Sequence, residues 1–215
     1  MSTKTKLSKK DLIAFEQEIA DEFNAGKIKA PVHGFSNLED DAIRIFRQVK
    51  DQDWIFGSWR SHHLCLLKGV PKDALKQEIM EGRSISLHFP KYRIFCSGIV
   101  GGSIPIALGT AKDIKRKKGK NHVWCFLGDM ASETGIFQEC YRYACRFDLP
   151  ITFVVEDNEV SVCTDTKKAL GIEEGEQIEA CYEAYHSEYL NGPKLIYFRY
   201  RSDLPHAGFG KRVMF

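Results

Sequence analysis

Residues 122–158 decide the fold, and this stretch reads HVWCFLGDMASETGIFQECYRYACRFDLPITFVVEDN. Two short apolar runs, at 122–127 and 151–155, flank a segment at 135–147 that has a helical pattern. A strand, a helix and a second strand in this order form a unit whose two strands run parallel and side by side. The stretch therefore predicts the centre of an α/β domain.

The rest of the chain continues this alternation of helices and strands. Ser8 and Asp11 form a capping box that predicts the start of a first helix, which we expect to end at Ala25-Gly26. We expect further helices at 37–49, 71–82, 104–118 and 173–189, strands at 53–56 and 194–199, a loop at 83–97 and a glycine-rich turn at 98–102. This order predicts a three-layer α/β fold, with a mainly parallel sheet flanked by helices.

Composition limits the classes of function. The formal net charge is +2, so bulk electrostatics give no case for nucleic acid, and the basic run at 115–118 is typical of a solvated helix end. Seven cysteines are scattered without metal-ligand spacing, which favours buried, reduced thiols. The polar N-terminus and the lack of a long apolar run lead us to expect a soluble, cytoplasmic protein without a membrane partner.

A carboxylate and an amide follow the two strands of the central unit. Asp129 ends the first apolar run and Asn158 follows the second, so both side chains are expected at one edge of the sheet. Two hard oxygen ligands there suit a magnesium ion that keeps phosphate oxygens as its other ligands. Spacing alone also fits a generic Rossmann-like domain, but the small residues Ala131, Ser132 and Gly135 let backbone approach a phosphate closely.

The central stretch resembles the thiamine diphosphate signature, which opens with Gly-Asp-Gly and closes with Asn-Asn. More narrowly, it is similar to the alpha subunit of thiamine-dependent 2-oxo acid dehydrogenases of the pyruvate and acetoin type. The matching segments, in the family's order, are Pro31-Val32-His33, residues 53–63, residues 97–105, Gly128-Asp129, Leu149-Pro150 and Glu156-Asp157-Asn158. The resemblance covers residues 30–201. It implies an N-terminal helical segment at 1–29 and a thiamine diphosphate- and magnesium-binding domain at 30–215.

The resemblance also implies roles for single residues. Asp129 and Asn158 would ligate magnesium through side-chain oxygens and Val160 through its carbonyl. Trp59 and Arg60 would contact the diphosphate, for which the guanidinium fork is suited; a surface ion pair is the alternative for Arg60. The remaining cofactor contacts would come from Gly98, Ile99, Val100, Gly128, Met130 and Ala131, although Gly98 to Val100 also fit a plain tight turn before a helix.

Histidines complete the implied site. His62, His63 and His206 lie at or near positions where the family keeps active-site histidines, with His88 as a weaker candidate. Such groups move protons near neutral pH, and a structural role is the alternative for each. Met130 departs from the family pattern in place of a glycine, and Asp157 in place of an asparagine. After Asn158 the segment is short, so that residues 164–176 replace a longer loop.

The family's activating glutamate lies on a pyrimidine-binding domain, for which this sequence leaves no room. A beta-type partner chain is therefore implied, in an α2β2 assembly, with a homodimer for the isolated chain and a lipoyl acyltransferase as a further candidate partner. With that partner, the chain would decarboxylate a 2-oxo acid and transfer the acyl or aldehyde unit. The alternatives are a shortened, non-catalytic cofactor-binding or assembly subunit and a transketolase-like half enzyme.

Overall fold

The computed structural model describes residues 7–171 and 195–210, and the chain forms two compact units. Unit 1 comprises Met1–Asp51, Gly57–Ile99 and Arg201–Phe215. Unit 2 comprises Gln52–Phe56 and Val100–Tyr200. The expected polar helix at 173–189 lies outside the described residues.

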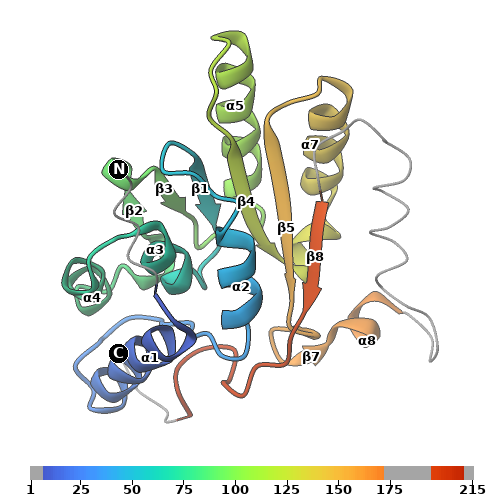
Figure 1. Cartoon of the computed structure of the whole chain (residues 1–215). Coiled ribbons are helices and arrows are strands. Elements are labelled where there is room, and N and C mark those ends of the chain that lie inside the picture. The colour runs from blue at the N-terminus through green and yellow to red at the C-terminus, as the bar shows by residue number, and fades with distance from the viewer. Residues whose placement is uncertain (1–6, 172–194, 211–215) are drawn as a thin grey trace. The chain divides into compact units, whose positions relative to one another are not determined.

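Unit 2 is built on parallel strands, which Figure 1 shows side by side. They are β1 (Trp54–Gly57, whose last residue belongs to unit 1), β4 (Val123–Gly128), β5 (Ile151–Asp157) and β8 (Leu195–Arg199). β4 pairs with both β1 and β5, and β5 also pairs with β8. Every residue of β5 is buried, as expected for a central strand of a parallel sheet. The predicted strands at 122–127 and 151–155 are confirmed.

Helices flank this sheet. α5 (Ser103–Arg116) packs on β4, β5 and α7 (Gly135–Arg146), and a short α6 (Asp129–Ser132) follows β4 directly. The hydroxyl of Thr134 caps α7 by accepting from the backbone N–H of Phe137. After β5 come a small antiparallel pair, β6 (Val160–Ser161) and β7 (Thr164–Asp165), and then α8 (Thr166–Leu170). The predicted α/β class with a mainly parallel sheet flanked by helices is confirmed.

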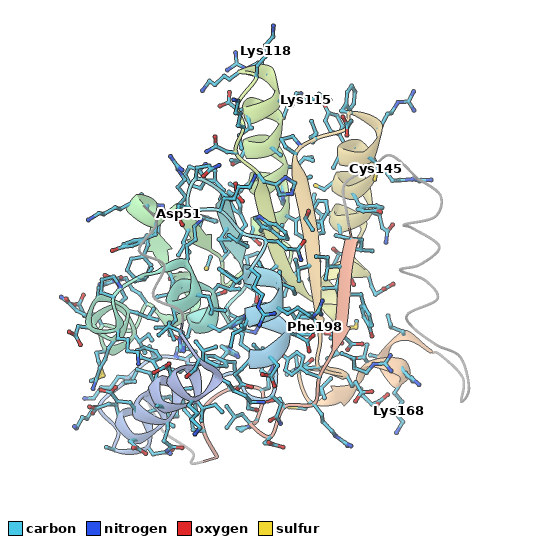
Figure 2. All side chains as sticks on the ribbon, in the orientation of Figure 1. Asp51, Lys115, Lys118, Cys145, Lys168 and Phe198 are labelled. Carbon is cyan, nitrogen blue, oxygen red and sulfur yellow. The ribbon has the colours of Figure 1, made fainter. Side chains whose placement is uncertain are left out.

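The basic run at 115–118 lies at the end of α5, where Figure 2 shows Lys118 projecting outward. The Lys115 ammonium donates to the carbonyl oxygens of Phe147 (2.7 Å) and Asp148 (2.9 Å), just beyond the last residue of α7. A cation at this position satisfies carbonyls that a helix end leaves without partners. The run therefore has a helix-end role, as the sequence predicts.

Unit 1 is mainly helical. Its helices are α1 (Lys9–Asn24), α2 (Glu39–Phe46), α3 (His62–Lys68) and α4 (Lys72–Met80). The Ser8–Asp11 capping box is present, and α1 ends at Ala25 as predicted. The core of the unit includes Leu12, Phe15, Ile19, Ile45, Leu64 and Leu75.

Three local expectations in unit 1 are corrected. α2 is shorter at both ends than the predicted range 37–49, because Asn37 has a positive φ of 65° and the chain turns after Phe46. α3 is not evident in the sequence, since no side chain caps its first turn. Residues 83–97 are not a plain loop: they contain two 3-10 turns and an antiparallel pair, β2 (His88–Phe89) and β3 (Ile94–Cys96).

Among the described cysteines, all are free thiols, and five of them are buried: Cys65, Cys96, Cys125, Cys140 and Cys145. Cys163 is exposed and departs from the expectation of burial, because it lies in the tight connection between β6 and β7.

No helix within residues 7–171 and 195–210 has the length and apolar character needed to span a membrane.

Candidate active site

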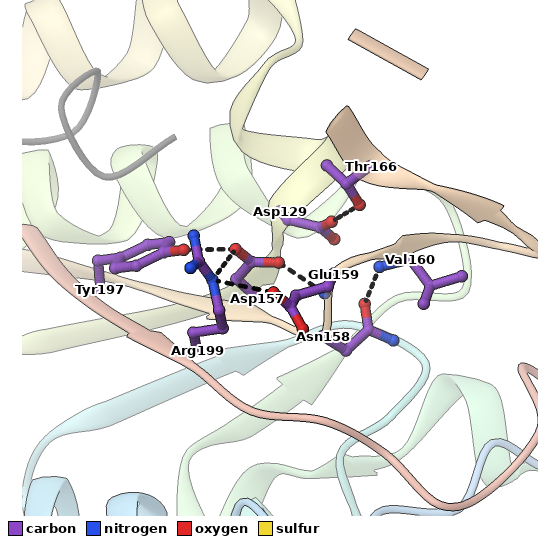
Figure 3. A network of polar contacts seen from close by, with 8 residues as sticks. All are labelled: Asp129, Asp157, Asn158, Glu159, Val160, Thr166, Tyr197 and Arg199. Atoms are coloured by element: carbon purple, nitrogen blue, oxygen red, sulfur yellow. Dashed lines mark hydrogen bonds and ion pairs between the residues drawn. The ribbon is translucent and has the colours of Figure 1, made fainter. Parts of the chain in front are cut away.

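Asp129 and Asn158 lie at the carboxyl ends of two neighbouring parallel strands of unit 2. Gly128, the last residue of β4, is in register with Glu156 of β5. Asp129 follows directly after β4, and Asn158 follows directly after β5. The two side chains predicted to share one edge of the sheet are therefore brought together by strand register. Figure 3 shows this edge and the polar contacts around it.

Asp129 is a buried carboxylate, with only 4% of its surface exposed. The Thr166 hydroxyl, at the start of α8, donates a hydrogen bond to its Oδ2 (Figure 3). Burial raises the pKa of Asp129 to about 6, the Thr166 hydrogen bond opposes that rise, and the nearby Asp157 carboxylate adds to it. A bound cation would relieve this cost, because it favours the charged form.

Asp157 is fully buried and is held by several groups. Its Oδ2 accepts from the Tyr197 phenol and lies 3.5 Å from the Arg199 Nε, and its Oδ1 accepts from the backbone N–H of Glu159 at 2.7 Å (Figure 3). Burial, and then the hydrogen bond to Asp157, raise the pKa of Tyr197. Asp157 thus anchors the start of the turn after β5 to β8, rather than facing a ligand.

Asn158 and Val160 form the turn that follows β5. The Asn158 Oδ1 accepts a 3.4 Å bond from the backbone N–H of Val160, and Glu159 between them has a left-handed φ of 63°. The backbone N–H of Thr166 donates to the Glu159 carbonyl at 3.0 Å, which ties α8 to this turn. The Asn158 amide oxygen thus bonds the backbone of its own turn.

The predicted ligands after β4 and β5 are of the chemical types that magnesium prefers. A carboxylate, an amide oxygen and a backbone carbonyl are hard oxygen ligands, and each oxygen keeps a lone pair beyond its present hydrogen bond. Within the described residues, no group of three or more His, Cys, Asp or Glu side chains is arranged to hold a metal. The predicted magnesium ligands are not a group of this type, because Asp129 is the one acidic side chain among them and the other two ligands are an amide oxygen and a backbone carbonyl.

Gly128, Met130 and Ala131 surround the start of α6. Gly128 is the residue before the helix, and a side chain built there would meet nothing within 4 Å. Met130 is half-buried, so its long side chain does find space, and Ala131 is buried. The space around Gly128 is therefore open, and the cofactor contacts predicted for this stretch stay predictions.

In unit 1, Arg60 is held by backbone carbonyls. Its Nε donates to the Gly34 carbonyl at 2.9 Å and its Nη2 to the His206 carbonyl at 3.4 Å. Arg60 has no ion pair among the residues that the structure describes, so the alternative of a surface ion pair is not what is observed. A half-buried guanidinium that forms no ion pair with a described carboxylate is suited to binding an anion.

His33 joins Trp59 and His206 beside Arg60. The His33 Nδ1–H donates to the His206 carbonyl at 2.6 Å, and the His33 ring centroid lies 5.7 Å from that of Trp59 and 4.7 Å from that of His206. Burial lowers the pKa of His33 to about 4, and burial together with Arg60 lowers that of His206. Sequence reasoning gave His33 no role, although the Pro-Val-His motif contains it and its ring contacts two of the predicted site residues.

His62 and His63 are fully buried at the start of α3, and their expected place at a reacting centre stays a prediction. His62 Nδ1 lies 3.0 Å from the Glu16 carboxylate and its Nε2 lies 2.8 Å from the Ser84 hydroxyl. The His63 ring packs edge-on against Phe35. His88 is exposed on β2. His206 is half-exposed, so His88 and His206 are the accessible histidines among these candidates.

The glycine-rich turn presents large apolar side chains to solvent. Ile99 is 73% and Val100 54% exposed, and the backbone N–H of Ile99 donates to the Ser97 hydroxyl. A side chain at Gly98 would press on Ile85 at 3.1 Å. Exposed apolar residues beside a backbone turn fit contact with a ligand or a partner.

The residues predicted to contact the cofactor are distributed over both units. Unit 1 contains Trp59, Arg60, Gly98 and Ile99, and unit 2 contains the others.

The fold and the carboxyl-edge oxygen donors define an α/β protein of the kind that binds a cofactor at its strand ends. A protein-family model described as dehydrogenase E1 component matches residues 9–183. The chain belongs to the dehydrogenase E1 component family.

Two curated relatives illustrate the similarity. The alpha subunit of acetoin:2,6-dichlorophenolindophenol oxidoreductase from Bacillus subtilis (strain 168) is 32% identical over 158 residues, covering 69% of this chain and 47% of the relative. The pyruvate dehydrogenase E1 component subunit alpha of Porphyra purpurea is 29% identical over 165 residues, covering 69% and 48%. The chain thus spans about half the length of the curated relatives it matches.

A solved structure shares the fold. It is described as that of a thiamin diphosphate-dependent enzyme from Mycobacterium smegmatis, with a TM-score of 0.51 and 16% sequence identity. The match covers 79% of this chain and 33% of that one. At this level of identity the likeness supports the fold alone.

Proposed function

We propose that this chain is the alpha-type, diphosphate-binding part of a thiamine diphosphate-dependent 2-oxo acid dehydrogenase. It decarboxylates a 2-oxo acid and transfers the acyl or aldehyde unit together with a beta-type partner. The observation that supports the proposal is the pairing of β4 with β5, because Asp129 and Asn158 follow the paired ends of these two strands. Membership of the dehydrogenase E1 component family supports the same assignment.

In this proposal, Mg²⁺ is bound by the Asp129 carboxylate, the Asn158 amide oxygen and the Val160 carbonyl. Because the Asp129 pKa is raised to about 6, its carboxylate is mostly ionised at neutral pH and gains from a cation. Arg60 and Trp59 are the diphosphate contacts, since the guanidinium keeps its positive charge among carbonyl oxygens. Thiamine diphosphate, when bound, supplies a carbon nucleophile for the carbonyl group of a 2-oxo acid.

His206 is the histidine that we propose for proton transfer. It is half-exposed, and burial and the Arg60 charge lower its pKa, so that its imidazole is neutral at physiological pH and can accept a proton. The beta-type partner would supply the activating glutamate in an α2β2 assembly, as the family resemblance implies. The exposed Ile99 and Val100 are candidates for contact with that partner or with the cofactor.

The proposal is tested on the chain co-purified with its beta-type partner. Thiamine diphosphate is titrated by calorimetry with and without Mg²⁺, and pyruvate or acetoin turnover is followed with an artificial electron acceptor. We expect magnesium-dependent binding, turnover of at least one substrate, and a loss of affinity on the order of tenfold to a hundredfold for Asn158→Ala. Val160→Ala is the matched control, because it keeps the carbonyl and should change the affinity by less than about twofold.

Two results would overturn the proposal: cofactor binding that does not depend on Mg²⁺, and equal effects of Asn158→Ala and Val160→Ala. In either case the oxygen donors after β4 and β5 would not be the metal ligands.

A second candidate, a non-catalytic assembly subunit, is favoured by one observation. Thr166 already occupies one oxygen of Asp129, and the Asn158 amide oxygen already accepts a bond from Val160. A complex that assembles with the beta-type partner, but in which neither wild type nor Thr166→Val binds thiamine diphosphate, would support this candidate instead.

A further inference from the structure

We propose that Thr166 is a positioning residue for the proposed metal ligands after β4 and β5, an inference that rests on the proposed function. The Thr166 hydroxyl donates to Oδ2 of Asp129, as the dashed line in Figure 3 shows, and its backbone N–H donates to the Glu159 carbonyl at 3.0 Å. Glu159 lies between Asn158 and Val160, the other two proposed ligands. One residue therefore bonds both the carboxylate ligand and the turn that carries the remaining ligands.

Thr166 is held by burial and by its place at the start of α8. Only 1% of its surface is exposed, so its hydroxyl needs a partner within the protein. The first backbone N–H groups of a helix have no partner inside that helix. In α8, the N–H of Thr166 bonds the Glu159 carbonyl, and the N–H of Lys168 donates to the Asp165 carboxylate at 3.1 Å. These bonds fix the backbone from which the Thr166 hydroxyl reaches Asp129.

The antiparallel pair β6 and β7 returns the chain from the Asn158 turn to Thr166. Val160 is in register with Asp165, the residue directly before Thr166. The connection between the two strands is tight, and Val162 within it adopts a left-handed φ of 57°. The short segment after Asn158 thus brings a hydroxyl donor back to the end of β4.

This contact suits a carboxylate that binds a metal. Each carboxylate oxygen has two lone pairs, so Oδ2 of Asp129 can accept from the hydroxyl while both oxygens keep lone pairs for a cation. Carboxylates that bind metals are themselves hydrogen-bonded, and the partners that orient them matter for metal affinity. The Thr166 hydroxyl is a neutral donor, so it orients the carboxylate without neutralising its charge.

The contrast with Asp157 supports this reading. The Asp157 carboxylate lies 3.5 Å from the Arg199 Nε, and a guanidinium at this distance offsets the negative charge. Asp129 has a hydroxyl from Thr166 as its side-chain donor instead. The charge of Asp129 is therefore left for a cation, whereas that of Asp157 is used within the fold.

The test uses the full chain co-purified with its beta-type partner, at one fixed concentration of thiamine diphosphate. Mn²⁺ replaces Mg²⁺ as the probe, and its binding is measured by electron paramagnetic resonance. Thr166→Val removes the hydroxyl and keeps the shape of the side chain, so the Mn²⁺ affinity should fall on the order of tenfold to a hundredfold. Thr166→Ser keeps the donor and should stay within about threefold of wild type.

Thr164→Val is the matched control, because it makes the same chemical change at an exposed threonine of β7 and should leave the Mn²⁺ affinity unchanged. A double-mutant cycle separates positioning of Asp129 from a general weakening of α8. If the hydroxyl acts through the carboxylate, Thr166→Val should change the Mn²⁺ affinity by less than about twofold in an Asp129→Asn background.

Three results would overturn the inference and leave the proposed function intact. They are Mn²⁺ binding by Thr166→Val that equals or exceeds that of wild type, a loss of affinity in Thr166→Ser as large as in Thr166→Val, and additive losses in the double variant. Absence of Mn²⁺ binding by the wild-type complex would overturn the inference and the proposed function together.

Discussion

Each unit contains a buried polar network, and the two networks differ in the charges of the groups that they bring together. In unit 1, the His62 imidazole lies between the Glu16 carboxylate and the Ser84 hydroxyl, so that a base, an acid and a hydroxyl satisfy one another. In unit 2, burial raises the pKa of Asp129 and the nearby Asp157 carboxylate adds to that rise, while Asp157 itself lies 3.5 Å from the Arg199 Nε. The first network contains complementary partners, and the second contains like charges.

The difference favours a structural role for the unit 1 network and supports the functional role that we propose for the unit 2 network. A fully paired buried network stabilises the fold and leaves nothing for a ligand to complete. A buried carboxylate with a raised pKa costs stability, and such groups gather at functional sites. The paired contacts of His62 favour the structural alternative for this histidine over the predicted catalytic role.

The largest effect is expected from His62→Ala. The change leaves the Glu16 carboxylate and the Ser84 hydroxyl buried without their shared partner, and should lower the free energy of unfolding by about 3 kcal/mol. Urea unfolding of the chain measures it. The matched control is His88→Ala on exposed β2, which should change stability by less than about 0.5 kcal/mol. Equal effects of the two changes would mean that His62 is not part of a structural network.

Arg60→Gln tests the proposed contact between Arg60 and the diphosphate of the cofactor. The change removes the positive charge while keeping a donor, so the affinity for thiamine diphosphate in the complex should fall on the order of tenfold to a hundredfold, the worth of a charged hydrogen bond. Arg44→Gln removes an exposed arginine of the same unit and should have no effect on this affinity. An unchanged affinity for Arg60→Gln would leave the diphosphate without its proposed cation.

Asp129→Asn should stabilise the chain when magnesium is absent. The pKa of Asp129 rises from its usual 3.8 to about 6, so the folded state resists ionisation. The resulting penalty is absent below about pH 4, grows as the pH rises, and is complete above about pH 6. At pH 7 the variant should therefore gain on the order of 2 kcal/mol in unfolding free energy.

Urea unfolding at pH 4 and pH 7 checks both the size and the sign of this effect. The gain of Asp129→Asn over wild type should vanish at the acid end. A loss of stability at pH 7 would show that the carboxylate is satisfied in the folded chain and would remove the contrast with the unit 1 network.

Local pattern and strand register made part of this structure predictable. Two apolar runs, one before Gly128 and one before Asn158, flank a helical segment. This pattern was enough to predict that two parallel strands lie side by side and end at the same edge of the sheet. The capping box at Ser8 and Asp11 likewise fixed the start of α1. These features depend on neighbours within about ten to forty residues and on the geometry of a parallel unit.

Contacts between distant segments were not predictable. Whether His62 faces inward depends on Glu16, which lies 46 residues away, and on α3, which has no capping side chain to announce it. Thr166 reaches Asp129 across 37 residues, and nothing in its local sequence marks it. The role of Asp157 is similar, because its partners Tyr197 and Arg199 come from β8.

Magnesium-dependent binding of thiamine diphosphate to Asp129→Asn tests the central claim most directly. The chain is measured by calorimetry with its beta-type partner, beside wild type and Asp113→Asn, which removes an exposed carboxylate of the same unit. We predict that Asp113→Asn binds as wild type does, whereas Asp129→Asn loses affinity on the order of a hundredfold, because a neutral amide replaces the anionic metal ligand. Retention of wild-type affinity by Asp129→Asn would contradict the assignment of this sheet edge as the metal and diphosphate site.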